Sequence, residues 1–306
     1  MRLTVIALII IGYTLPAKLL SQPDSVNCFV EIQDIWDIDF DRGTSMVDFY
    51  LTIKYGKPYN IDFYLLNGEI NTLDTVINNT DKNYLTVRIV AEIRNSFEFK
   101  KYPLDRQEIA IKIEPFLYAQ DVILFSEPYQ NTYVGEIHLN GWETEQISYK
   151  SKITTYRVNE DNKIKGYSYS NAIFVVPIIR DQRFLYAFKI FIPSIISILI
   201  IYIGFLIPPS NIESRLNLSV GSLFVMISNF IVTQQMLPNV SSITLVEKVN
   251  ILGLIIVFLT ILHFALGFRF KTKLSGNAWK LLKLTFVGLT AMLYFLLIIT
   301  LAKAGL

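Results

Sequence analysis

Segment 211–238 contains the polar side chains whose types and spacing most clearly indicate a functional site in this sequence. The segment is long enough to cross a bilayer as a helix, yet polar groups occur along its whole length: Asn217, Ser219, Ser222, Ser228, Asn229, Thr233 and Gln234. An unsatisfied polar group in hydrocarbon is costly, so a helix surrounded by lipid would not tolerate this density. We therefore expect the helix to be enclosed by protein, to face water, or both, which is typical of the wall of a pore.

Polar residues occupy two opposite faces of this predicted helix. One face runs in steps of three and four residues within an arc of about 80°, and its members are Glu213, Asn217, Gly221, Phe224, Ser228, Ile231 and Gln235. The other face carries Ser219, Ser222, Asn229 and Thr233. Small polar residues of the second kind suit close packing against neighbouring helices. Periodicity alone does not decide which face would line a pore.

The elements that must position this helix are three further apolar segments. The four candidate spans are about 184–207, 212–237, 244–267 and 279–302, each near the roughly 20 residues that a bilayer requires. Pro193 lies inside the first span, and Pro208 with Pro209 ends it. Basic residues cluster around the third-to-fourth connection: Arg269, Lys271, Lys273, Lys280 and Lys283. The positive-inside rule places that connection in the cytoplasm, so we expect a multi-pass cell-membrane protein, in the plasma or inner membrane, whose N-terminal domain is extracellular or periplasmic.

Residues 1–21 are predicted to be a secretory signal peptide. Arg2 is followed by the apolar run 3–11, and the small residues Ala17 and Ser21 stand near a plausible cleavage point. Roughly ten apolar residues are too few to cross about 30 Å of hydrocarbon. An uncleaved anchor or an ordinary first strand is the alternative.

Composition excludes several classes of function. The net charge is +2 over 306 residues, with a hydrophobic fraction of 52%, and nothing in this balance indicates a nucleic-acid partner. Cys28 is the only cysteine, so an internal disulfide is impossible. The two histidines, His138 and His263, are too few for a zinc site. We expect neither a metal nor a cofactor.

Residues 22–182 are predicted to form an extracellular all-β domain, followed by a transmembrane domain over 183–306. Aromatic and β-branched runs with strand-like alternation occur at 47–55, 84–90, 108–113, 153–158 and 172–179, with turn residues between them. Many short strands at this spacing favour an immunoglobulin-like sandwich of about ten strands.

Residues 97–107, FEFKKYPLDRQ, are followed by the alternating residues Ile109, Ile111 and Ile113. Together with four spans, a proline in the first and the Leu237–Pro238 pair ending the second, this segment resembles the signature loop of the pentameric ligand-gated ion channels, the Cys-loop receptor superfamily. The two cysteines that bracket the loop in animal members correspond to Asn95 and Ile109. The chain therefore resembles a prokaryotic-type member without the disulfide, which the short connection at 268–278 also suits.

The resemblance implies a homopentamer in a lipid bilayer, with the stripe from Glu213 to Gln235 lining a pore. Five copies of Glu213 would favour permeant monovalent cations, although an acidic residue at a helix N-terminus is also favourable by itself. Phe224 is the predicted gate, because an apolar ring can stop ions by dewetting, and its alternative is ordinary helix packing. Arg215 is expected to point away from the stripe, to the lipid interface or an adjacent helix.

The resemblance also implies a ligand site lined by aromatic residues. Phe116 and Tyr118 resemble one binding segment, and Tyr167 with Tyr169, near the end of a loop from 158 to 172, resembles a capping hairpin. Such rings could hold an amine by cation–π attraction, although a sandwich core uses many aromatic residues too. Trp142 is expected to pack at the start of a strand instead.

Coupling between the domains is expected to run through Pro103, Leu104 and Asp105, placed over the 238–244 loop that begins at Pro238. Asp105 is predicted to pair with a basic residue just before the first span, and Arg180 is favoured over Arg183. Asp39 or Asp41 could join this network. A solvated turn is at least as good an interpretation of these two aspartates.

Two other classes compete with a ligand-gated or proton-gated cation channel. An enzyme is not expected, because the sequence has no Ser/His/Asp or Cys/His arrangement, no glycine-rich phosphate loop and no zinc spacing. A membrane-anchored extracellular sensor that does not conduct would explain the sandwich and the spans. It would not explain a second span that is polar along its length. The sequence does not name the agonist and leaves small-molecule and proton gating open.

Overall fold

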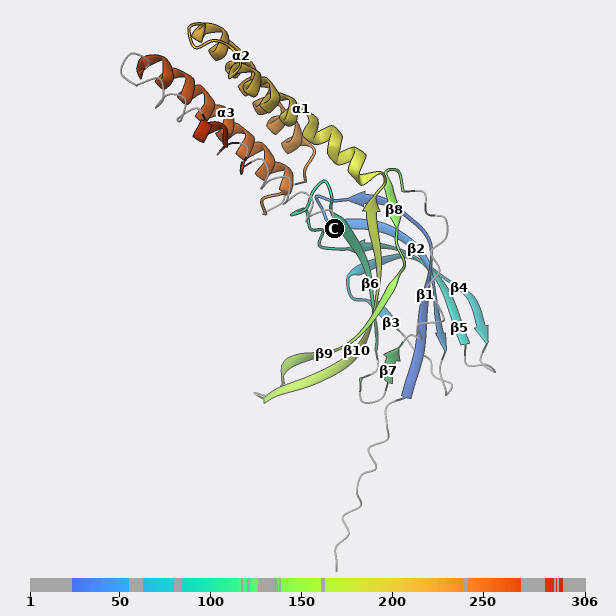
Figure 1. The fold of residues 1–306 in the computed structure, drawn as a ribbon. Helices are drawn as coiled ribbons and strands as arrows, with labels where there is room; N and C mark the ends of the chain where they lie inside the picture. Colours follow the sequence, from blue (N-terminus) through green and yellow to red (C-terminus); the bar gives the residue numbers. More distant parts are fainter. Residues whose placement is uncertain are drawn as a thin grey trace, which may run out of the picture.

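The computed structural model of the protein describes residues 24–54, 63–79, 84–116, 118–119, 122–125, 137, 139–160, 163–238, 242–270, 284–288, 290 and 292–293. Ten strands are followed by three long helices in these residues (Figure 1). The predicted signal peptide lies outside them. Most of the predicted fourth span lies outside them too, although residues 284–288 are helical.

The strands form two sheets. The first has the order β4 (Gly68–Asn79), β5 (Tyr84–Arg94), β2 (Thr44–Lys54), β1 (Asp24–Asp39) and β7 (Val122–Phe125). The second has the order β3 (Phe63–Leu65), β6 (Arg106–Pro115), β10 (Lys163–Arg180) and β8 (Trp142–Thr144), and β9 (Ser148–Glu160) also pairs with β10. Only β7, which is parallel to β1, departs from antiparallel pairing among the pairs of described strands.

The core of the β domain lies between these sheets. Alternate residues of β2, such as Phe49 and Leu51, and of β6, such as Ile109 and Ile111, are fully buried and belong to one cluster. A strand places successive side chains on opposite faces, so the alternation seen in the sequence becomes one buried face on each sheet. The predicted β-sandwich followed by apolar helices is confirmed at this level.

The segment from 158 to 172 is not the loop that the sequence predicted. Strands β9 and β10 pair continuously from Ser148 with Val175 to Glu160 with Lys163, so Tyr167 and Tyr169 lie on a strand. Gly166 has low strand propensity, but unbroken pairing with β9 outweighs that preference. The resulting hairpin extends well beyond the body of the sandwich (Figure 1).

The three helices begin and end near the predicted bounds. They are α1 (Arg183–Gly204), α2 (Ile212–Gln235) and α3 (Leu245–Phe270), and each is long and apolar enough to cross a membrane. The Asn211 side chain accepts from the Ser214 backbone at the start of α2. Thr244 and Glu247 accept from each other's backbone N–H at the start of α3, which is a capping box.

Candidate functional site

All seven residues of the predicted pore stripe lie on the exposed face of α2. Phe224 is 67% exposed and Ile231 is 51% exposed. The opposite polar face, with Ser219, Ser222, Asn229 and Thr233, is buried. Burial therefore separates two faces that periodicity could not: one packs within the chain, and the described part of the chain leaves the other uncovered.

Small residues allow the buried face of α2 to pack closely. Ser197 of α1 donates from Oγ to the backbone oxygen of Ser222 at 2.8 Å. On the α3 side, Met226 lies so near Gly253 that a Cβ added there would be 2.4 Å from the Met226 Cε. This close packing is what small residues at helix interfaces provide in a membrane.

Arg215 packs against its own chain. Its guanidinium donates from Nε to the backbone oxygen of Ile207 at 2.9 Å and lies 5.1 Å from the ring centre of Phe264 on α3. The side chain is consequently buried. Of the two predicted destinations, the adjacent helix is the one that the structure shows.

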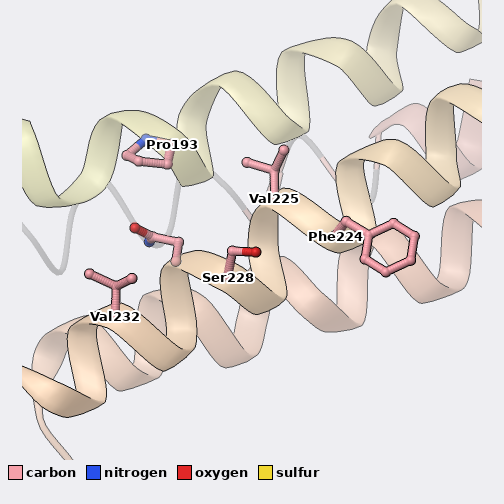
Figure 2. A pocket seen from close by; sticks show the side chains of 6 residues that line it. Pro193, Phe224, Val225, Ser228 and Val232 are labelled. Atoms are coloured by element: carbon pink, nitrogen blue, oxygen red, sulfur yellow. The ribbon is translucent and has the colours of Figure 1, made fainter.

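A groove flanks the stripe where α2 meets α1. Its cavity has a volume of about 440 Å³ and is lined by Pro193, Phe224, Val225, Ser228, Asn229 and Val232. Figure 2 shows Val225 and Val232 pointing toward the helix that carries Pro193, with Phe224 directed to the side. Phe224 and Ser228 thus belong both to the stripe and to the wall of the groove.

The aromatic residues predicted for a ligand site lie close together. Tyr118 stacks on Tyr167 with ring centres 5.5 Å apart and contacts Tyr169 at 5.2 Å. Phe116 contacts Tyr64 at 5.0 Å and is 61% exposed. The rings come from β3, β10 and the segment after β6, and we call this group, together with Tyr156, the aromatic cluster.

A buried carboxylate at this cluster was missed by the sequence reasoning. Glu114 is fully buried, and its two oxygens accept hydrogen bonds from the hydroxyls of Tyr64 and Tyr156. Tyr156 also contacts Tyr169, with ring centres 5.7 Å apart. The sequence offered one signal for this site. Glu114 is a charged residue that directly follows the alternating apolar residues Ile109, Ile111 and Ile113.

The tyrosines that surround Glu114 remain donors at physiological pH. Burial raises the pKa of the Tyr64, Tyr156 and Tyr169 hydroxyls above the ordinary value, and the neighbouring carboxylate of Glu114 adds to the rise. A phenol with a raised pKa keeps its proton. Tyr64 and Tyr156 can therefore donate to the carboxylate throughout the neutral range.

Amide side chains close the loop at 97–107. Gln107 bonds to both the backbone N–H and the backbone oxygen of Glu98, each at 2.9 Å. Asn95 accepts from the Ala110 backbone N–H at 2.8 Å. These bonds join the two ends of the loop, where the resemblance places a disulfide in animal members.

Asp105 in this loop pairs with Arg180 at the end of β10. The Arg180 Nε lies 3.3 Å from the Asp105 carboxylate, whose side chain is only 1% exposed. The guanidinium also lies over the rings of Trp142, Tyr102 and Tyr186, at 4.4, 5.0 and 5.1 Å from their centres. Trp142 thus packs at the start of β8, as expected.

Arg183, the other candidate partner, lies over Phe184 on α1. Asp39 does not join the pair of Asp105 and Arg180. Its carboxylate accepts from the backbone N–H groups of Asp41 and Arg42 instead. It pairs with the Arg42 side chain at 3.5 Å. The solvated-turn interpretation therefore describes Asp39.

Apolar residues of the same loop pack on the ends of the helices. Phe99, Tyr102 and Leu104 share a buried cluster with residues of α1 and α3, namely Ala187, Ile190, Phe191, Leu245, Val246 and Val249. Leu237 packs against this cluster, while residues 239–241 of the 238–244 loop lie outside the described residues. The 97–107 loop of the β domain is therefore in direct contact with α1 and α3.

No protein-family model matches the chain. Among curated proteins, it is 20% identical to the gamma-aminobutyric acid receptor subunit rho-3 of Homo sapiens over 184 residues, which is 59% of this chain and 38% of that subunit. The rho-3 subunit of Rattus norvegicus is 20% identical over 60% of this chain and 39% of its own length. The human rho-1 subunit is 19% identical over 59% of this chain and 36% of its own length.

The chain thus spans less than two fifths of the length of these curated relatives. They are receptor subunits and not enzymes, which agrees with the expectation from the motifs. The likeness supports the superfamily that residues 97–107 indicate and says nothing of a prokaryotic type. With three helices fit to span a bilayer, the chain is a membrane protein.

Proposed function

We propose that the chain is a subunit of a homopentameric ligand-gated ion channel of the prokaryotic type, selective for cations, with α2 lining the pore. One observation carries this proposal: α2 exposes the stripe from Glu213 to Gln235 while its other polar face is packed against α1 and α3. A helix with a polar face left uncovered in a membrane needs water or other chains on that face. Five copies around a water-filled axis supply both.

The rings of such a pore would have distinct roles. Glu213 would concentrate cations at the cytoplasmic mouth, and Phe224, whose ring is mostly exposed, would form the apolar gate. Asp105 with Arg180 would connect the β domain to the helices, because the loop that carries Asp105 packs on α1 and α3. The N-terminal domain would lie outside the cell, as the positive-inside rule indicates.

The ligand that best fits the aromatic cluster is a small organic cation such as a primary amine. Phe116 and Tyr118 are exposed aromatic residues whose rings attract cations, and the buried carboxylate of Glu114 is bonded to the neighbouring Tyr64 and Tyr156. The names of the similar subunits mention gamma-aminobutyric acid, which also carries an amine. Gating by protons alone is the alternative, and bilayer recordings must distinguish it from gating by an amine.

Reconstitution of the purified full-length chain in planar bilayers tests the proposed function. We expect discrete unitary currents when either the proton concentration or one of a panel of primary amines is raised on the side of the β domain. The reversal potential in a salt gradient should approach that of the cation. A correctly assembled protein that stays silent under every amine and pH would instead be the non-conducting sensor.

Exchanging Glu114 for glutamine should weaken opening by amines. Glu114 is buried, so it acts on the ligand through its charge. A unit charge several ångströms from a cation at a partly buried site contributes about 1–3 kcal/mol, so we expect the half-activating concentration of a primary amine to rise roughly 10- to 100-fold. Glu108→Gln is a matched control, because Glu108 is an exposed carboxylate on the same strand. Equal responses of Glu114→Gln and the wild type would contradict the proposal that amines bind at the aromatic cluster.

A further inference from the structure

Four polar side chains join the three described helices in the half of the bundle nearer the β domain. Asn250 of α3 accepts from Ser194 of α1 at 2.9 Å and from Asn229 of α2 at 3.0 Å. Asn229 also donates to Ser194 at 2.9 Å, and Asn250 donates to Thr233 of α2 at 2.9 Å. We call Ser194, Asn229, Thr233 and Asn250 the four-residue network.

The network lies inside the protein and is not a wet surface feature. Asn250 is fully buried, Ser194 and Thr233 are each 1% exposed, and Asn229 is 9% exposed. Amides are costly to bury within a membrane unless they are bonded. An arrangement of the helices that breaks these bonds therefore leaves amides unsatisfied where water cannot replace the lost partners.

The network determines the rotation of α2 about its own axis as well as its contact with α1 and α3. Asn229 and Thr233 alternate along α2 with the stripe residues Ser228, Ile231 and Gln235, and a helix advances about 100° per residue. Turning α2 by one residue position would carry Asn229 toward the stripe side and away from Ser194 and Asn250. Three of the four hydrogen bonds involve α2, and one rotation of α2 satisfies all three, with the stripe as the uncovered face.

The contact nearer the middle of the bundle is less specific. Ser197 of α1 donates to a backbone oxygen of α2, that of Ser222, and every turn of a helix offers such an oxygen. The network instead requires particular side chains at particular positions. Pro193 next to Ser194 removes one helical hydrogen bond from α1, so this part of α1 depends more on its neighbours for its position.

We propose that the four residues of the network are positioning residues that set the rotation of α2, and with it which face lines the proposed pore. This inference rests on the proposed function and deepens it by naming what holds the pore face in place. Asn229 also lines the groove beside Pro193, so the network meets this groove through that side chain.

Engineered thiols can measure the rotation of α2 directly. Single cysteines would be placed at the stripe positions Ser228 and Ile231 and at the flanking positions Leu223 and Val225, and their modification by a water-soluble thiol reagent followed in liposomes. Cys28 gives little background, because it is buried and burial raises the pKa of its thiol to about 12. In the wild type, the stripe positions should react fastest.

In an Asn250→Leu background, the stripe positions should react more slowly and one flank faster. We expect the ratio of stripe to flank rates to fall by about tenfold, as the loss of a buried hydrogen bond implies. The effect should follow the number of hydrogen bonds to α2 that each variant removes, which is two for Asn250→Leu and Asn229→Leu and one for Ser194→Ala and Thr233→Val. The graded series keeps the test decisive if Asn250→Leu does not fold.

Thr260→Val is the matched control on α3. Thr260 is fully buried like Asn250, but its hydroxyl donates only within its own helix, to the Ile256 backbone oxygen at 2.8 Å. It should leave every rate unchanged. The double variant Asn229→Leu with Asn250→Leu should show less than the sum of the two single effects, because no partner amide is left unsatisfied.

The outcomes separate the two proposals. Slow reaction of the stripe in the wild type would contradict the proposed pore itself. A fast stripe in the wild type whose pattern does not change in any network variant would overturn the positioning role while leaving the pore intact. An equal change at all four cysteine positions would indicate loosened packing, and would also overturn it.

Discussion

Replacing Glu213 with glutamine should cost the channel its preference for cations over anions. The residue lies in the exposed first turn of α2, and five copies would form the only acidic ring of the stripe. A mouth lined by one sign of charge raises the local concentration of counter-ions by about 10- to 1,000-fold. We therefore expect the cation-to-anion permeability ratio to fall by about tenfold or more, measured as a reversal potential that moves toward zero in a salt gradient.

The glutamine variant should fold, because the cap of α2 does not use Glu213. Asn211 accepts from Ser214 at the start of that helix, and an acidic residue in the first turn adds about 0.3–1 kcal/mol. Glu213→Asp keeps the charge and should keep the selectivity. Asp181→Asn removes an exposed carboxylate off the stripe and should have no effect. An anion-selective wild type, or unchanged selectivity in Glu213→Gln, would contradict the proposed acidic ring.

Helix bounds could be predicted from the sequence because they depend on local properties. An apolar run of bilayer length and the pair Pro208–Pro209 define the end of α1 and the start of α2 without knowledge of the neighbours. The orientation of α2 could not be predicted in the same way. Both faces carry polar groups, and only the positions of α1 and α3 reveal that Asn229 and Thr233 are the buried ones.

Strand pairing explains what was missed in the β domain. Glu114 meets Tyr64 because β3 pairs with β6, and it meets Tyr156 because β9 folds back along β10. These residues are far apart in sequence, so no spacing rule brings them together. The register also explains Arg180: Ile178 pairs with Gln107 and Ile179 with Arg106, which leaves Arg180 opposite Asp105.

Removing the charge of Asp105 should stop opening and destabilise the protein. Asp105→Asn leaves the Arg180 guanidinium at a mostly buried site without its counter-charge. Breaking a buried ion pair from one side costs about 3–5 kcal/mol, although the rings of Trp142, Tyr102 and Tyr186 retain part of the attraction for the cation. We expect a lower melting temperature together with the loss of agonist-evoked current. Arg88→Gln is a control, because it breaks the half-exposed pair with Asp48 on the first sheet and should leave gating unchanged.

A double variant separates stability from coupling at this junction. Replacing a buried ion pair by apolar residues of similar size is often neutral or stabilising, so Asp105→Leu with Arg180→Met should recover the melting temperature of the wild type. If Asp105 and Arg180 transmit opening, the current should stay lost in this stable protein, because the loop no longer has a charged link to the residue that precedes α1. Recovery of both the melting temperature and the current would show that the pair serves folding alone, and the cluster of Phe99, Tyr102 and Leu104 on α1 and α3 would then be the route between the domains.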